Sequence, residues 1–386
     1  MLTMAVGHSD DPVAADAIAA AIEEARGGLG GRSPQAAILF STVETFDPSM
    51  LAAVQEAFPG VRLMGASSSA EISTSGGYLE DSISLALLAA DGVDITVGLG
   101  SGLGADVDAA CRTAVAQAMA ATEQEPRLCI VFSESSAVDP KSTLDALTAA
   151  LPEGILVLGG SSARNDFTTM TPTFQFAGDA VAQDGVAIML FSGPIRFSAA
   201  VGTGWRTLGP RGRITRADDG LVQEIDGRPA VEFLARYLDA AGPATYANPL
   251  AIFEAGSEEF YLRASPSSDP ETGALALGGS IPVGAEVQLT SADVDEVLAG
   301  TRDALERAVK DFPEGASPEA ALVFSCAVRK FMLGSRTRVE AEMARSVLGE
   351  GFPIAGLYCF GEFAPAGGAP TSKVLNETFV TVLLGT

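Results

Sequence analysis

The sequence predicts an α/β protein with mixed sheets, built from three related β-α-β-β-β modules and layered with helices outside. The main observation is an internal repeat: ILFSTVETFDPSMLAAVQEAFPGVRLMGASSSAE returns as IVFSESSAVDPKSTLDALTAALPEGILVLGGSSARND. A third, weaker copy, ALVFSCAVRKFMLGSRTRVEAEMARSVLGEGFPIAGLYCFGEFAPAG, closes the chain. Strands that alternate with helices favour α/β layers, and the paired strands ending each module favour some antiparallel pairing.

The first two copies share the signals of a strand followed by a helix. Each has an apolar run that ends in Phe-Ser, at 40–41 and 132–133, and then an Asp-Pro pair. Aspartate at an N-cap accepts the free N–H groups of the first helical turn, and proline at the next position has no N–H to leave unpaired. The helices predicted there have apolar stripes formed by Met50, Leu51, Val54 and Phe58 and by Leu144, Leu147 and Leu151.

The remaining strands and helices are predicted from the same local signals. Each copy continues with a second β-run and then two more strands joined by a short turn. After the second copy, the chain reads as a hairpin turning at Asp218-Asp219-Gly220 and leading into a helix, so we place the domain junction there, giving domains 1–215 and 216–386. A further helix is predicted from about Asp293 to Phe312.

Composition narrows the class of protein. The 386 residues are 47% apolar and 19% charged, which is enough for two or three domains with buried cores. No apolar run reaches the ~20 residues of a membrane span, and the first residues lack a signal peptide pattern, so we expect a cytoplasmic location. Four scattered cysteines fit reduced thiols. The net charge of −25 repels phosphate backbones and anionic lipids, so neither nucleic acid nor membrane is expected as a partner.

The repeats place polar residues where a ligand site is expected. In open α/β sheets the ligand crevice lies at the carboxyl ends of strands. If the modules pack about a pseudo-symmetric centre, these ends converge into one polar pocket suited to a small zwitterion or polar metabolite. The candidate ligand-binding residues are Ser67, Ser68, Glu71, Ser161, Ser162, Arg164, Asp166, Ser325, Cys326, Arg329, Tyr358, Glu362 and Asn376. Turn chemistry is the alternative explanation for each serine, because serine is common wherever a chain turns.

Several kinds of site are disfavoured by the residues present. With His8 as the single histidine, a multi-histidine metal site cannot form, and no metal or cofactor is expected. Lys141 and Lys330 lie near predicted strand ends, but no S-x-x-K signature is present. A G-x-G-x-x-A pattern begins at Gly100, yet its alternating glycines are more typical of a strand packed close to another backbone than of a dinucleotide site.

These segments resemble the FIST (F-box and intracellular signal transduction) family, whose chains have an N-terminal and a C-terminal FIST domain. GASSSAEIS and GGSSARND look like two of its N-terminal segments, GTGWRTLGPRGRITRADDGLVQEIDGRPAVEFL looks like its junction, and NPLAIF, LALGGSIPVGAEVQL and GLYCFGEFAP follow in the family's order. The resemblance implies an intracellular sensory role, with amino acids or other small molecules as ligands and a signalling protein as partner. The chain departs from the family pattern at Ala70, Arg164 and Leu375.

Three functions stay open on the sequence alone. The first is a sensor that binds a small polar ligand, possibly an amino acid, and signals through a partner. The second is a hydrolase or transferase that uses Ser325, Cys326 or a strand-end serine as nucleophile, with Glu362 assisting. The third is a scaffold without catalytic activity, in which the repeats only build structure.

Overall fold

Three six-stranded mixed sheets form the body of the protein, and all three have the same strand order. The first contains, in spatial order, β1 (Leu2–Ser9), β6 (Ile83–Ala90), β2 (Ala36–Thr42), β3 (Arg62–Ser68), β10 (Gln175–Ala177) and β11 (Ala180–Ala182). The second contains β7 (Asp94–Ser101), β12 (Gly185–Ser192), β8 (Pro126–Ser133), β9 (Leu156–Ser161), β24 (Glu362–Pro365) and β25 (Ser372–Leu375). The third contains β13 (Arg196–Gly202), β26 (Phe379–Gly385), β22 (Ala320–Cys326), β23 (Ile354–Cys359), β4 (Glu71–Ser73) and β5 (Gly77–Leu79).

The structure is a computed structural model that describes residues 1–134, 136–166, 171–218, 220–238, 248–254, 256–264, 267–366 and 371–386. Asp219, in the middle of the predicted turn, lies outside these residues. In each sheet one pair of strands is parallel, β2 with β3, β8 with β9 and β22 with β23, and the other pairs are antiparallel. The predicted α/β class with mixed sheets is therefore confirmed.

Each sheet takes its last two strands from a different copy of the repeat. The hairpin β10–β11 of the second copy pairs with β3, the hairpin β24–β25 of the third pairs with β9, and the hairpin β4–β5 of the first pairs with β23. The strands β6 and β7, which the sequence reads as joined by a short turn, also lie in different sheets. The three copies are thus interlocked rather than side by side.

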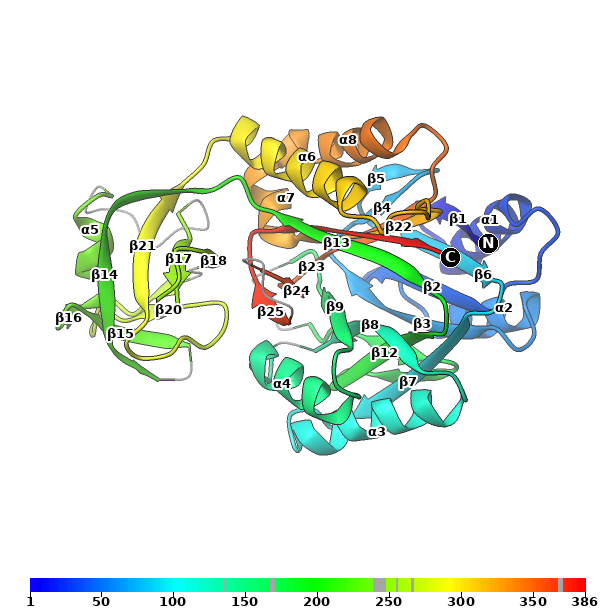
Figure 1. Cartoon of the computed structure of the whole chain (residues 1–386), viewed down its shortest axis with the longest axis horizontal. Coiled ribbons are helices and arrows are strands. Elements are labelled where there is room, and N and C mark those ends of the chain that lie inside the picture. The colour runs from blue at the N-terminus through cyan, green and yellow to red at the C-terminus, as the bar shows by residue number, and fades with distance from the viewer. Residues whose placement is uncertain are drawn as a thin grey trace.

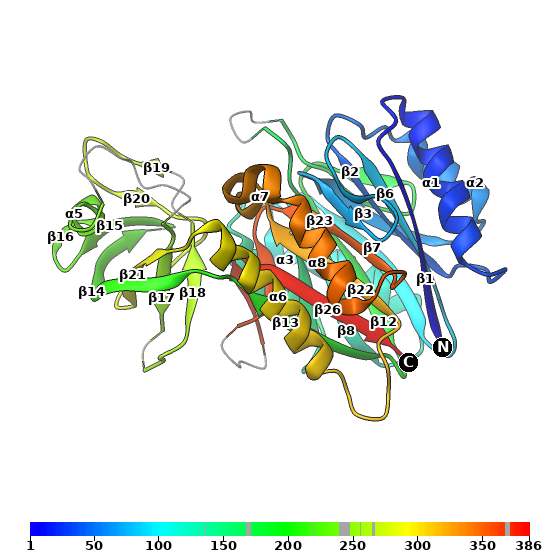
Figure 2. The same cartoon turned by 90° about the horizontal axis from the view of Figure 1, so that it is seen from above.

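Helices cover the outer face of each sheet (Figures 1 and 2). They are α1 (Ala14–Gly28) and α2 (Ser49–Ala57) on the first, α3 (Val107–Ala120) and α4 (Pro140–Ala150) on the second, and α6 (Val294–Lys310) and α8 (Arg338–Leu348) on the third. The helix α7 (Ala327–Leu333) and a 3₁₀ turn (Gly334–Arg336) connect β22 to α8. As predicted, α4 begins at Asp139-Pro140, where the Asp139 carboxylate accepts the N–H of Lys141 at 3.1 Å, and α6 begins at a capping box of Asp293 and Glu296.

The inner faces of the sheets meet in one apolar core. At its centre are the phenylalanines of the three Phe-Ser strand ends. The ring of Phe132 lies edge-on to the ring of Phe40, with centroids 5.2 Å apart, and close to the ring of Phe324, at 5.9 Å. Aromatic pairs at these distances stabilise a core beyond the area they bury. The repeated Phe of each module therefore lies where the three modules meet.

A separate β lobe is inserted between β13 and α6 (Figure 1). It contains β14 (Arg206–Asp218), β15 (Leu221–Ile225), β16 (Arg228–Pro229), α5 (Ala230–Ala235), β17 (Leu250–Phe253), β18 (Phe260–Arg263), β19 (Ser267–Ser268), β20 (Leu275–Ala276) and β21 (Glu286–Ser291). The predicted hairpin is β14 with β15. The proposed boundary at 215/216 falls within β14, and the division into two domains stays a prediction.

Glycines on β1, β7 and β13, the edge strands that precede the helices α1, α3 and α6, let these helices pack closely on the sheets. A Cβ atom on Gly100 would overlap the carbonyl oxygen of Ala110 in α3, and similar overlaps would arise at Gly7 with α1 and at Gly202 with α6. The close backbone packing expected of the alternating glycines is therefore present.

We expect Gly100→Val to destabilise the protein by roughly 1–3 kcal/mol or more, because the helix must move away from the strand. Chemical unfolding followed by far-ultraviolet circular dichroism measures the change. Gly27→Ala is the matched control, since a Cβ there meets nothing within 4 Å, and it should leave stability unchanged or raise it by up to about 1 kcal/mol. Equal unfolding midpoints for the two variants would contradict this account of the packing.

Candidate functional site

The ends of the second strands of all three modules are joined in a ring of backbone hydrogen bonds. The three bonds run from Ala163 N–H to Ser67 O, from Ser69 N–H to Tyr358 O and from Phe360 N–H to Ser161 O, each 2.9 Å long. The ring follows from the exchange of hairpins, because each exchanged segment begins directly after a second strand. The predicted strand ends are therefore brought together at one centre.

Most of the predicted site residues at this centre are buried. Asp166 is exposed, and Arg164 and Asn376 are each 7% exposed and border an opening. The exposed fraction is at most 2% for the other ten, which are Ser67, Ser68, Glu71, Ser161, Ser162, Ser325, Cys326, Arg329, Tyr358 and Glu362. These ten form a polar core below the surface, and their role in ligand binding stays a prediction.

One part of this polar core surrounds Glu71 on β4. Its carboxyl group accepts hydrogen bonds from the hydroxyls of Ser68 and Ser82. Ser82 Oγ also lies 3.0 Å from Nε2 of His8, whose Nδ1 lies 2.7 Å from Ser73 Oγ. Burial raises the pKa of Glu71 to about 8 and lowers the pKa of His8 to about 4. Both groups are therefore mainly neutral at neutral pH, which suits their low exposure.

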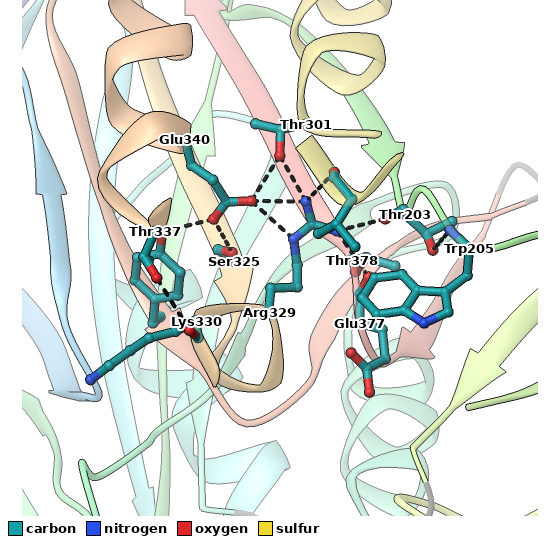
Figure 3. Close-up of polar contacts among 12 residues, drawn as sticks. Thr203, Trp205, Thr301, Ser325, Arg329, Lys330, Thr337, Glu340, Glu377 and Thr378 are labelled. Atoms are coloured by element: carbon teal, nitrogen blue, oxygen red, sulfur yellow. Dashed lines mark hydrogen bonds and ion pairs between the residues drawn. The ribbon is translucent and has the colours of Figure 1, made fainter. Parts of the chain in front are cut away.

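A second part is the buried ion pair of Arg329 and Glu340 (Figure 3). Nη2 of Arg329 lies 2.8 Å from the Glu340 carboxylate, and both side chains have no exposed surface. Glu340 also accepts hydrogen bonds from Ser325 at 3.0 Å and from the phenol of Tyr358 at 2.7 Å. Thr301 donates to the same carboxylate at 2.7 Å. This network connects α7 and α8 to β22, β23 and α6.

A third part contains two thiols and two carboxyl groups. Glu362 accepts a hydrogen bond from Thr378 Oγ1 at 2.6 Å and one from the Cys359 thiol at 3.4 Å. Burial raises the pKa of Glu362 to about 8 and raises the pKa values of Cys359 and Cys326 well above their ordinary range. Glu377 is fully buried as well, and burial raises its pKa. Both thiols therefore stay protonated at neutral pH, a state in which they are weak nucleophiles.

Above the centre lies an opening of about 880 Å³, which we call the acidic pocket. All three modules contribute to it. Its lining residues are Glu44, Glu80 and Asp81 from the first, Asn165 and Asp166 from the second, and Ala327, Val328, Lys330, Phe331 and Gly334 from the third. The predicted convergence of strand ends therefore does produce an opening, although a different set of residues lines most of it.

Lys330 is the basic residue among those lining the acidic pocket, and it links the three modules. Its ammonium donates to the Ser69 carbonyl at 2.8 Å and to Asn165 Oδ1 at 2.9 Å, and it lies 3.3 Å from the Glu80 carboxylate. Asn165 in turn donates to Asp81 at 2.7 Å. Figure 3 shows the side chains of Arg329 and Lys330 leaving α7 in opposite directions. Lys330 is therefore already held by several acceptors at the base of the pocket.

Sequence reasoning missed Asn165, Lys330 and the acidic residues of the first module as lining residues. Asn165 lies between two predicted residues, and Lys330 directly follows a third. Glu44 lies in the loop after β2, and Glu80 and Asp81 lie in the turn between β5 and β6. Attention to these loops, and not only to the last residues of the strands, would have found them.

Comparison with known proteins identifies the family. The FIST N domain matches residues 35–228 and the FIST C domain matches residues 230–365, so the chain belongs to the FIST family. FIST domains are associated with signal transduction and with the sensing of small ligands.

The curated relatives that match this chain are named as uncharacterized proteins, so their names point to no activity. An uncharacterized protein of Mycobacterium tuberculosis (strain ATCC 25618 / H37Rv) is 29% identical over 183 residues, which cover 44% of this chain and 46% of the relative. An uncharacterized protein of Mycobacterium bovis (strain ATCC BAA-935 / AF2122/97) is 28% identical over 223 residues, or 55% of each chain. The chain thus spans about half the length of the curated relatives it matches.

Among solved structures, cyanuric acid hydrolase from A. caulinodans is similar with a TM-score of 0.38 and 11% identity, covering 100% of this chain and 99% of that one. A likeness of this size supports no conclusion about fold or activity.

Within the part of the chain that the structure describes, no helix is long and apolar enough to cross a membrane. Within the same residues, no cluster of three His, Cys, Asp or Glu side chains is arranged to hold a metal ion.

The raised pKa of Glu71 predicts a pH-dependent stability. Its folded-state pKa of about 8 lies above the ordinary value of 4.5, so the stabilisation is complete below pH 4.5 and is lost as pH rises through 8. We expect Glu71→Gln to remove part of this slope, on the order of 1 kcal/mol per pH unit between about pH 5 and 8. Urea unfolding at several pH values measures it. The control is Glu23→Gln, because that side chain is 81% exposed, and identical slopes for both variants would refute the assignment.

The buried ion pair predicts a large cost when one partner is removed. Arg329→Met should destabilise the protein by about 3–5 kcal/mol, because it leaves the Glu340 carboxylate buried without its cation. Adding Glu340→Gln to that variant should recover part of the loss. Arg302→Ala, which breaks an exposed pair with Glu306, should change stability by less than about 0.5 kcal/mol. Equal costs for the buried and the exposed arginine, measured by urea unfolding, would argue against this role.

Proposed function

We propose that this protein is an intracellular sensor that binds a small polar molecule with an ammonium group in the acidic pocket and reports its presence to a signalling protein. The observation that supports the proposal most strongly is that all three interlocked modules meet at this pocket. A ligand there contacts every module at once, so its binding free energy acts on the whole body of the protein. Amino acids and small amines are the ligand classes with the required charge.

The charges around the pocket favour a cation. Among the described residues that line it, four have carboxylates, namely Glu44, Glu80, Asp81 and Asp166, and one is a lysine. Lys330 pairs with Glu80 and otherwise contacts Asn165 and the Ser69 carbonyl, so the lining keeps a net negative charge. An exposed pair of opposite charges about 4 Å apart gains on the order of 1 kcal/mol in water and more where water is partly excluded. Several carboxylates therefore select for an ammonium group and against an anion.

The helix α7 is the proposed link between ligand and output. Ala327, Val328 and Phe331 on this helix form an apolar wall of the pocket, and Phe331 is 70% exposed. A large exposed aromatic residue next to a ligand pocket is suited to contact a partner protein. Because Arg329 fixes the base of the helix, a ligand is expected to reposition the exposed turn that contains Phe331.

An enzyme that uses Ser325 or Cys326 as nucleophile is the second candidate. The Ser325 hydroxyl donates to Glu340, and the Cys326 thiol is buried with a raised pKa. Nucleophilic catalysis requires an accessible group with a nearby base. The geometry therefore favours the sensor over this alternative, and over a scaffold that would need no acidic pocket.

Thermal-shift screening against amino acids and small amines tests the proposal. A ligand at a hundred times its Kd should add about 2.7 kcal/mol to stability, and Asp81→Asn or Glu80→Gln should reduce that gain severalfold. Glu23→Gln should leave it unchanged. A response that persists in both pocket variants would place the ligand elsewhere. Turnover of the ligand that is abolished by Cys326→Ala would favour the enzyme, and no response to any compound would favour the scaffold.

A further inference from the structure

A second opening lies between the β lobe and the second module, and we call it the interlobe groove. It consists of two adjoining cavities of about 590 Å³ and 480 Å³ that share Asp139 and Ser280. One wall is the N-terminal end of α4 with the loop before it, and the other is the segment 277–282 of the β lobe. The lining differs from that of the acidic pocket, because two largely buried arginines border it.

The first of these arginines is Arg263 on β18 of the β lobe. It is 3% exposed, and its Nη1 donates to the Val374 carbonyl at 2.8 Å and to the Leu262 carbonyl at 3.2 Å. Its Nε is buried with no hydrogen-bond partner. Among the described residues, no carboxylate lies within 4 Å of its guanidinium. The guanidinium lies over the ring of Tyr261, 4.6 Å from its centroid, and burial lowers the pKa of Arg263 although Tyr261 and Asp139 oppose the shift.

The second is Arg164, on the segment that follows β9. It is 7% exposed and stacks over Phe360. Nε donates to the Asp166 carbonyl at 3.1 Å, and Nη1 reaches Ser136 Oγ only at 3.5 Å. In the part of the chain that is described, Nη2 has no acceptor within hydrogen-bond distance, and no carboxylate approaches the guanidinium within 4 Å.

Each lysine of the groove is paired with a carboxylate, whereas Asp139 has no ion pair among the described residues. Lys141 pairs with Asp145 at 2.5 Å, and Lys373 pairs with Glu254 at 2.8 Å. The Asp139 carboxylate accepts the N–H of Lys141 as the cap of α4. Among the described residues, the two arginines are thus the cations of the groove that have no carboxylate within 4 Å.

We propose that the interlobe groove binds a small organic anion with two acidic groups, one held by Arg164 of the body and the other by Arg263 of the β lobe. Guanidinium groups bind carboxylate and phosphoryl oxygens through paired N–H donors, and such bonds strengthen when water is excluded. The glycine turn beside Arg263 fits this role, because a Cβ on Gly279 would lie 3.2 Å from Nε and crowd it. Since the arginines belong to different lobes, the anion bridges them. This inference does not depend on amine binding in the acidic pocket.

Isothermal titration of the full chain with malonate, succinate, glutarate and methylenediphosphonate tests the proposal, with sodium chloride at equal ionic strength as the blank. One dianion should bind with a stoichiometry of one, and the preferred compound shows whether carboxyl or phosphoryl groups are recognised. Arg164→Met and Arg263→Met should each weaken binding by about tenfold or more. Arg302→Met, at an exposed pair on α6, is the matched control and should bind normally.

A further variant keeps the test decisive if Arg263→Met does not fold. Ser280→Asp places a negative charge in the groove while both arginines remain, and it should abolish binding of the dianion. Circular dichroism confirms folding of each variant. The proposal is overturned if no dianion gives heat beyond the blank, or if binding survives unchanged in folded Arg164→Met and Ser280→Asp proteins.

Discussion

The exchange of edge hairpins among the three sheets is the constraint on which the rest of the structure depends. Each sheet is completed by two strands from another copy of the repeat, so no copy can satisfy its own backbone hydrogen bonds. The exchanged segments must pass one another at the ends of the second strands, and the ring of backbone bonds there follows directly. In the apolar core, the side chain of Phe132 packs against those of Phe40 and Phe324, so the first strands of the three modules also meet.

This crossing explains why so many polar side chains are buried at the centre. Chains that cross must turn, and serine, glutamate and threonine side chains replace the hydrogen bonds that regular strands would provide. Burial then keeps Glu71 and Glu362 protonated near neutral pH, while Arg329 and Glu340 compensate each other's charge. Removing one partner of such a pair is costly, because the other charge is then left buried without compensation. The pair therefore anchors the base of α7, at Arg329, beside the acidic pocket.

The repeat in the sequence was enough to predict the class of fold, the helix start at Asp139 and the meeting of strand ends, and an apolar stripe predicted the helix that begins at Asp293. It was not enough to predict the hairpin exchange, because the pairing partners are distant: Ser73 pairs with Ala355, and Gln175 with Ala66. Local periodicity shows that a strand exists but not which strand it joins. For the same reason the burial of Glu71 was not predictable, since a residue at the end of an isolated strand would face water.

The segment 164–166 separates the two openings and borders both. Arg164 faces the interlobe groove, Asn165 and Asp166 face the acidic pocket, and Arg164 Nε is bonded to the Asp166 carbonyl. If the interlobe groove binds the proposed anion, a shift of the guanidinium toward the β lobe would act on the Asp166 backbone through this bond. Binding energy at one site can change affinity at another only through an element whose position both ligands affect. The segment 164–166 is the candidate for such an element, because Arg164 lines one opening and Asp166, of opposite charge, lines the other.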